Sequence, residues 1–491
     1  MLPAATVLGA GELGRACACA LAANHSVAAV RLLTRDVAMA APTTAAAPHP
    51  SRHRSGSEGA AAAVGRWPST VSLRDVRGCR GEAAAPQPLF LCTPCVSYLA
   101  ADDAWARAAY GGAHSPTTQE LLSAWRPATT STAAAAATPS NFVAVFSRGF
   151  TADGAVAAEL AESLLNEPHA ERGGAAVVTP VLVASGPVVA QEWARQSTPV
   201  VAGAAPSPLS PDPPRPRSAL MASASPAPAS TADGGQLPHA YSGVALTFAA
   251  WTPSIAADAG RQAALAEQLQ LLFPRESVTY LTAPDAAAVL ALVNACAPLC
   301  SFGAGLVSSV YVGTSTTSLA AYAQHAVAAT EQLANALLGR TPGTPLPLPA
   351  VATLWCACTS LVSREFALGR KLDFYFRKQD AIQAVYHGHE HHVFAATVDG
   401  LHERMRGCGV ASPLYEVLMD TYNTMVRASR AGEGLVKEGY YGYREVLADG
   451  AGGGELLQQA VNVDEAMLSG DEARFTAAKE RIMRTFAAST F

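Results

Sequence analysis

Short apolar runs separated by helical stretches fill residues 1–282 of the chain. Strands that alternate with helices in this way predict a doubly wound, mainly parallel sheet, and therefore an α/β domain. The runs that predict strands are 4–8, 27–33, 89–92, 141–146, 180–184 and 244–248. From residue 283 the pattern changes to long helical stretches, which predicts an all-α domain over 283–445. A glycine-rich segment at 450–454 then sets apart a final polar helix, so 446–491 is predicted to be an appendage.

Three segments rich in Ala, Pro, Ser and Thr interrupt the first domain, at 38–67, 104–140 and 203–240. Their composition lacks the apolar residues that a packed core needs, so we expect disordered insertions there. Residues 286–330, in contrast, are mainly apolar and contain no Asp, Glu, Lys or Arg. A membrane-spanning helix needs about 20 predominantly apolar residues, but polar residues, prolines and glycines interrupt this segment. We therefore expect a helix buried in a domain core and no membrane span.

Composition and charge argue against several classes of function. Only 15% of the 491 residues are charged and the net charge is −5, which gives no electrostatic basis for binding nucleic acid. The ten cysteines lack the spacing of a zinc site and are expected to be reduced, structural thiols. No secretory signal is present, and the C-terminal Ser-Thr-Phe differs from a Ser-Lys-Leu peroxisomal signal, so a cytoplasmic location is expected.

The first predicted strand leads into Gly9-Ala10-Gly11-Glu12-Leu13-Gly14. Glycines at these spacings allow a tight strand-to-helix turn, a close approach of backbone to pyrophosphate, and close helix–strand packing. The helix N-terminus adds free N–H groups for the phosphates. The motif therefore predicts a dinucleotide site in a Rossmann-like domain. After the second strand, Asp36 suits the ribose of NAD whereas Arg35 suits the 2′-phosphate of NADP, so NAD is expected and NADP stays an alternative.

Five further patches, in order along the chain, resemble the NAD-dependent glycerol-3-phosphate dehydrogenases of bacteria and some protozoa. They are Leu-Cys-Thr-Pro at 91–94, Val-Phe-Ser-Arg-Gly-Phe at 145–150, Ser-Gly-Pro-Val-Val-Ala-Gln-Glu at 185–192, the segment 358–369, and 409–416. Together with the glycine turn they cover residues 1–425. Related ketopantoate and hydroxyisobutyrate reductases share the two-domain plan but lack the patches at 185–192 and 363–364.

The resemblance implies reduction of dihydroxyacetone phosphate with NADH, a small phosphorylated substrate, and a homodimer. It assigns cofactor binding to Gly9, Gly11, Glu12, Leu13, Gly14, Arg35, Pro94, Arg148, Ala190, Arg364 and Glu390. It assigns substrate binding to Arg148, Gly186, Ser363, Arg364 and Glu365.

The chain departs from this family at the residues that carry the chemistry. If Gly303-Ala304-Gly305 sets the register, the family's catalytic Lys-Asn falls on Ala297-Pro298. The Asp of the family's Gly-x-Gly-Asp-Leu motif falls on Thr353. A methyl group cannot supply a proton, and Arg148, which replaces a Lys, is a poor general acid because a guanidinium does not readily give up a proton. Glu365 replaces an Asn and should repel a bound phosphate. We therefore expect NAD(H) binding with weak or absent dehydrogenase activity, or alternatively an inactive nucleotide-binding protein with a regulatory or interaction role.

A histidine cluster comprises His387, His389, His391 and His392 around Glu390. Imidazoles could move protons near neutral pH, and His389 and His392 could share a helical face as metal ligands. The cluster therefore allows three interpretations: a solvated helix end, a role on the cofactor side, or a metal site.

Overall fold

A computed structural model describes the chain over separate ranges. The described residues are 4–9, 11–24, 26–34, 70–75, 87–93, 122, 141–170, 178–190, 193, 244–273, 277–310, 316–361, 363–371, 390–423, 473, 476, 477 and 480. Apart from position 122, the insertions predicted at 38–67, 104–140 and 203–240 lie outside the described residues. So does nearly all of the appendage predicted at 446–491.

The described strands form one sheet in the order β3-β2-β1-β4-β5-β6-β7-β8. Neighbouring strands are parallel except for β6 and β7, which are antiparallel. The strands are β1 (Ala5–Leu8), β2 (Val30–Thr34), β3 (Val71–Asp75), β4 (Leu89–Leu91), β5 (Val143–Val145), β6 (Val181–Ser185), β7 (Ala245–Ala250) and β8 (Ser277–Leu281). Strand order reverses at β1, which pairs with β2 on one side and β4 on the other. This is the doubly wound arrangement that the sequence predicts.

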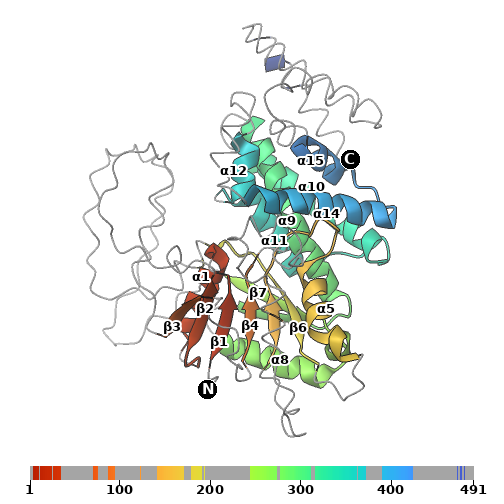
Figure 1. Ribbon diagram of the computed structural model, residues 1–491. Helices are drawn as coiled ribbons and strands as arrows, with labels where there is room; N and C mark the ends of the chain where they lie inside the picture. The colour runs from red at the N-terminus through yellow and green to blue at the C-terminus, as the bar shows by residue number, and fades with distance from the viewer. Residues whose placement is uncertain are drawn as a thin grey trace, which may run out of the picture.

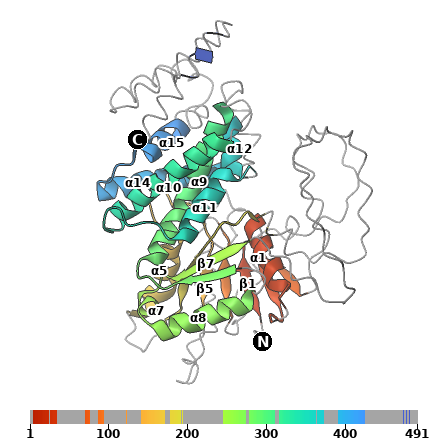
Figure 2. The same cartoon turned by 180° about the vertical axis from the view of Figure 1, so that it is seen from behind.

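Two cores form because successive strand residues point to opposite faces of the sheet. In β1, Ala5 and Val7 join the core under helices α1 (Glu12–Ala22) and α8 (Ala259–Leu272), with the short α7 (Pro253–Ala256) beside α8. Leu8 joins the opposite core, under α5 (Ala157–Ala170). Figures 1 and 2 show the sheet between these helices. Coverage on both faces explains why the central strands read as continuous apolar runs.

The helical domain, α9 to α15, lies beyond one end of the strands (Figure 1). Its helices are α9 (Ala286–Val310), α10 (Thr316–Leu337), α11 (Leu348–Thr359), α12 (Arg364–Lys371), α14 (Glu390–Cys408) and α15 (Pro413–Tyr422). The central helix α9 packs against the other five. Among the described residues, one helix segment, Ala286–Ser308, is long and apolar enough to cross a membrane. It is 89% buried, which confirms the predicted core helix.

The two domains meet where the loop after β5 packs against α14. A Cβ atom at Gly400 would overlap the carbonyl oxygen of Thr151, so the two backbones are in direct contact. Beside this contact, Arg404 forms a two-pronged ion pair with Glu159 of α5, with N–O distances of 2.9 and 3.1 Å. Arg404 also donates to the carbonyl oxygen of Gly154 at 3.3 Å. Loop, α5 and α14 therefore form one fixed junction.

We expect Arg404→Ala to lower the free energy of unfolding by about 1–2 kcal/mol, because the paired guanidinium makes charge-assisted hydrogen bonds and is only about a third exposed. Urea unfolding measures this change. Arg406→Ala is the matched control, since Arg406 is 70% exposed and, among the described residues, forms an ion pair with Glu403 one turn away. Exposed pairs of this kind contribute little, so equal effects of the two substitutions would contradict a stabilising role for the junction at Arg404.

Candidate functional site

The glycine turn at residues 9–14, called here the dinucleotide turn, lies at the point where strand order reverses. Gly9 has a φ of 104°, which is accessible mainly to glycine. A Cβ atom at Gly9 would also lie 3.0 Å from the carbonyl oxygen of Cys92, which follows β4. A Cβ atom at Gly14 would overlap the carbonyl oxygen of Gly9. The fold itself therefore requires glycine at both positions, for the turn and for close packing of α1.

Gly11 is different because nothing in the fold requires glycine there. Its φ of −64° and ψ of 178° suit any residue. Among the described residues, and apart from its chain neighbours, a Cβ atom at Gly11 would meet no atom within 4 Å. Gly11 is also the N-cap residue of α1 and makes no side-chain cap, although Asp or Ser at that position would stabilise the helix. The open space therefore lies over the N-terminus of a helix, where backbone N–H groups favour an anion.

The next two residues of the turn have separate surroundings. Glu12 is exposed and begins α1, while Leu13 packs against the core beneath α1. Leu13 thus anchors the helix N-terminus. The backbone N–H groups at the start of α1 are placed where they could hold an anionic group such as a pyrophosphate.

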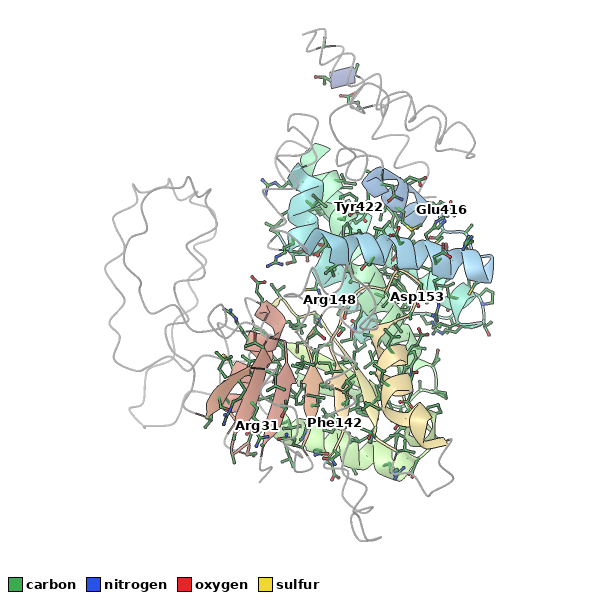
Figure 3. The ribbon with its side chains drawn as sticks, viewed as in Figure 1. Arg31, Phe142, Arg148, Asp153, Glu416 and Tyr422 are labelled. Atoms are coloured by element: carbon green, nitrogen blue, oxygen red, sulfur yellow. The ribbon has the colours of Figure 1, made fainter. Side chains whose placement is uncertain are left out.

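The loops that follow β5 and β6 are joined by Arg148. Its guanidinium donates to the carbonyl oxygen of Val188 at 3.3 Å. Figure 3 shows Arg148 between the end of the sheet and the helical domain. The structure thus brings the patches 145–150 and 185–192 together, and Ala190 lies half-buried in the second of them.

Gly186, predicted as a substrate contact, has a steric role in the fold. Its φ is 142°, and a Cβ atom there would overlap the carbonyl oxygen of Ala245 in β7. The glycine therefore permits the close approach of the β6 end to β7. Arg35 and Pro94 lie outside the described residues, as do His387 and His389, and Glu390 marks the start of α14. The three interpretations of the histidine cluster stay predictions.

A buried neutral network joins the sheet to the helical domain. Ser185, at the end of β6, donates to the side-chain oxygen of Asn294 in α9 at 2.7 Å. The Ser185 hydroxyl also lies 3.2 Å from the hydroxyl of Thr353 in α11. Asn294 donates to the carbonyl oxygen of Ala184 at 2.8 Å, and Thr353 to that of Pro349 at 2.9 Å. We call Ser185, Asn294 and Thr353 the neutral network, because each uses its polar atoms on the others or on backbone.

Ala297 lies one turn beyond Asn294 on α9, and Ser301 one turn beyond Ala297. Residues three and four apart share a helix face, so this face runs from the neutral network to Ser301. Ala297 is 1% exposed. Helix α9 contains no Asp, Glu, Lys, Arg or His, and position 298 is Pro. The structure therefore brings the Ala297 and Thr353 positions to one region through the neutral network, and the described residues of α9 give that region no Asp, Glu, Lys, Arg or His.

At the far end of the same face, Ser301 meets the start of α12. The hydroxyls of Ser301 and Ser363 are 2.6 Å apart. Ser363 donates to the carboxylate of Glu365 at 3.1 Å and accepts from the backbone N–H of Phe366 at 3.2 Å. Arg364 is exposed at the first position of α12. The predicted substrate residues Ser363 and Glu365 are therefore brought together, but they bind each other.

Sequence reasoning missed Ser185, Asn294 and Ser301 as members of this region. A signal was present, because Asn294 and Ser301 are polar residues seven apart in an apolar helix, and that spacing places them on one face. Their partners were not predictable, since Ser185 lies 109 residues from Asn294.

The sequence matches no protein-family profile and no curated protein. The solved structures that are similar to this one include two glycerol-3-phosphate dehydrogenases. A glycerol-3-phosphate dehydrogenase from Saccharomyces cerevisiae aligns over 87% of this chain and 99% of its own, with a TM-score of 0.47 and 14% identity. A glycerol-3-phosphate dehydrogenase from Plasmodium falciparum aligns over 85% of this chain and 90% of its own, with a TM-score of 0.46 and 11% identity. The fold class, a doubly wound sheet domain followed by an all-α domain, rests on the strand order and helix packing of the chain itself.

Proposed function

We propose that this chain binds NAD(H) at the dinucleotide turn and is a glycerol-3-phosphate dehydrogenase-like protein whose dehydrogenase activity is weak or absent. The observation that carries the cofactor proposal is Gly11. Unlike Gly9 and Gly14, it has no conformational or steric reason to be glycine, and the space above it faces a helix N-terminus. A ligand that approaches the backbone closely supplies that reason.

Bound NADH would supply the reducing equivalent for a carbonyl substrate. The residues of this chain would hold its pyrophosphate through the backbone N–H groups that begin α1. Arg148 is fixed between the two loops beyond β5 and β6, where its positive charge can orient an anionic group. These features support cofactor binding. They do not identify a residue that would donate the proton to a reduced carbonyl.

The proposal of weak or absent activity rests on the lining of the region around Ala297. A reduced carbonyl needs a proton, and general acid catalysis contributes about 10²–10⁴-fold in rate. Ala297 has a methyl group, and the hydroxyl of Thr353 is engaged with Ser185 and Pro349. The alternative function, nucleotide binding without turnover in a regulatory or interaction role, is favoured by the same neutral network.

We expect Gly11→Asp to weaken NADH binding at least about 100-fold while leaving the melting temperature unchanged or slightly raised. The new carboxylate would repel the pyrophosphate, whereas Asp is a better N-cap than Gly by a few tenths of a kcal/mol. NADH fluorescence titration and thermal unfolding measure the two effects. The matched control is Gly260→Asp, which places a carboxylate in the exposed first turn of α8.

The outcomes separate the proposals. Absence of NADH binding by the wild-type chain would overturn cofactor binding. Turnover near 10 s⁻¹, roughly the enzyme median, in an assay of NADH oxidation with dihydroxyacetone phosphate would overturn the proposal of weak or absent activity.

A further inference from the structure

Helix α11 presents an apolar face to solvent. Four large apolar side chains are exposed among the described residues, and three of them lie on α11 or just beyond its end: Leu348 at 79%, Trp355 at 45% and Leu361 at 54%. Leu348 and Trp355 are seven residues apart, so they lie two turns apart on one face of the helix. The half-buried Val351 and Ala352 lie between them. We call Leu348, Trp355 and Leu361 the α11 patch.

The sequence that carries the α11 patch contains no charge. No Asp, Glu, Lys, Arg or His occurs in 341–363, between Arg340 and Arg364. The uncharged segment Ala286–Ser308 is 89% buried, and burial accounts for its composition. Burial does not account for 341–363, because eight of its described residues are exposed. Protein surfaces ordinarily carry charges of both signs, so an exposed apolar segment without any marks a surface that another surface covers.

We propose that the α11 patch is the contact surface of a symmetric homodimer. In a two-fold contact, a patch meets its own copy, so a charge near the axis would face the same charge and weaken association. A segment without charge avoids that repulsion. A partner of different sequence would gain orientation and encounter rate from complementary charge, and the patch offers none. The inference does not depend on cofactor binding.

Trp355 is the expected centre of the contact. It lies between Leu348 and Leu361 along the chain, and Trp is enriched among the residues that dominate binding energy at interfaces. A helix of 12 residues is about 18 Å long and about 10 Å wide. It therefore supplies only part of the roughly 800 Å² that each partner buries in a standard interface. We expect a reversible dimer with a dissociation constant in the micromolar range.

The dimer would support α11 from the side opposite the neutral network. Thr353 lies on the buried face of α11, and its hydroxyl is 3.2 Å from that of Ser185. The buried face packs against α9, α10 and β6. A second copy on the exposed face would therefore enclose the helix that holds Thr353 in place.

Sedimentation velocity of the full-length chain over a series of concentrations, under reducing conditions, tests the proposal. We expect a reversible monomer–dimer equilibrium. Trp355→Lys and Leu348→Lys should each raise the dissociation constant at least about 100-fold, because two-fold symmetry places each new charge in the contact twice. The matched control is Leu271→Lys, since Leu271 is 57% exposed but lies in α8 of the sheet domain. Its dissociation constant should stay within about twofold of the wild-type value.

The outcomes decide between the possible occupants of the patch. A chain that stays monomeric at every concentration, as it would if another part of the same chain covered the patch, would overturn the inference. A dimer that both α11 substitutions leave intact, or that Leu271→Lys weakens equally, would contradict it too. Binding to phosphatidylcholine vesicles that Leu348→Lys abolishes would assign the patch to a membrane surface and overturn the dimer. Circular dichroism checks folding, and the more exposed Leu348 keeps the test decisive if Trp355→Lys fails to fold.

Discussion

Replacing Gly369 by alanine is expected to lower the free energy of unfolding by about 3 kcal/mol. A Cβ atom at Gly369 in α12 would overlap the carbonyl oxygen of Phe302 and would lie 2.8 Å from the backbone nitrogen of Leu306, both in α9. The contact is reciprocal, because a Cβ atom at Gly305 would overlap the carbonyl oxygen of Phe366. Backbone cannot move aside as a flexible side chain can, so the two helices must separate. Overpacking of this kind costs about 1–3 kcal/mol and occasionally more.

Gly407→Ala is the matched control for this prediction. Gly407 lies in α14, and a Cβ atom there would meet nothing within 4 Å. Alanine should therefore stabilise the helix by about 0.5–1 kcal/mol. Urea unfolding of both variants gives the comparison. An equal change in the free energy of unfolding for Gly369→Ala and Gly407→Ala would contradict a close backbone contact between α9 and α12.

The crossing of α9 and α12 also explains how the start of α12 is positioned. Gly305 is four residues beyond Ser301 on α9, and Gly369 is on the same short helix as Glu365. Close backbone contact at the glycines brings the hydroxyls of Ser301 and Ser363 to 2.6 Å. We expect Gly369→Ala to disturb this hydroxyl pair as well as stability. Hydrogen exchange at the Phe366 amide, which donates to Ser363, would report the disturbance.

The central strands of the sheet could be predicted from the local pattern of apolar residues, but the two edge strands could not. Strands β1, β4, β5 and β6 are buried along their full lengths, so each reads as an uninterrupted apolar run. The edge strands β3 and β8 were missed. β3 has the sequence Val-Ser-Leu-Arg-Asp with Arg74 exposed, and β8 exposes Thr279. An edge strand lacks one neighbour, and its mixed composition resembles that of a loop. The antiparallel pairing of β6 with β7 depends on a long connection and has no local signal either.

One part of the candidate site could also be predicted from the sequence, and another part could not. The dinucleotide turn is encoded within six consecutive residues, so spacing alone predicts Gly9, Gly11 and Gly14. The neutral network is assembled from three elements far apart in sequence, and no spacing rule links Ser185 to Asn294 or Thr353. The sequence does indicate what is missing there, because the absence of Asp, Glu, Lys, Arg and His from helix α9 can be read directly. The packing of α9 against β6 and α11 is needed to show that Ser185, Asn294 and Thr353 are the neutral groups in this region.

The second large effect is expected at alkaline pH, because burial keeps several weakly acidic groups protonated. In the helical domain, the Cys300 thiol lies 3.2 Å from the hydroxyl of Tyr415, which contacts Thr330 at 2.7 Å. Burial raises the pKa of Cys300 to about 11. Burial also raises the pKa values of Cys358 and Tyr415 well above their usual ranges. In the sheet domain, burial raises the pKa of Cys19 to about 11, against a smaller lowering by Arg15.

The sign of the effect follows from proton linkage. An unfolded chain loses a thiol proton near pH 9, whereas the folded chain keeps it up to about pH 11 at Cys300 and Cys19. Between these values the folded state binds more protons, so its stability is fully present below pH 9 and falls as pH rises. Each such thiol contributes a slope of about 1.4 kcal/mol per pH unit. Cys300 and Cys19 together should lower the free energy of unfolding by about 3 kcal/mol for each unit above pH 9.

Urea unfolding at intervals between pH 8 and pH 11, under reducing conditions, measures this slope, and Cys19→Ala isolates one contribution. Truncating a buried thiol lowers stability at every pH, but the slope above pH 9 should become shallower by about 1.4 kcal/mol per unit. Cys408→Ala is the control, since Cys408 is exposed at the end of α14, and it should leave the slope unchanged. Stability that stayed flat from pH 9 to pH 11 would show that water reaches these thiols, because only a group kept from solvent can resist ionisation over that range.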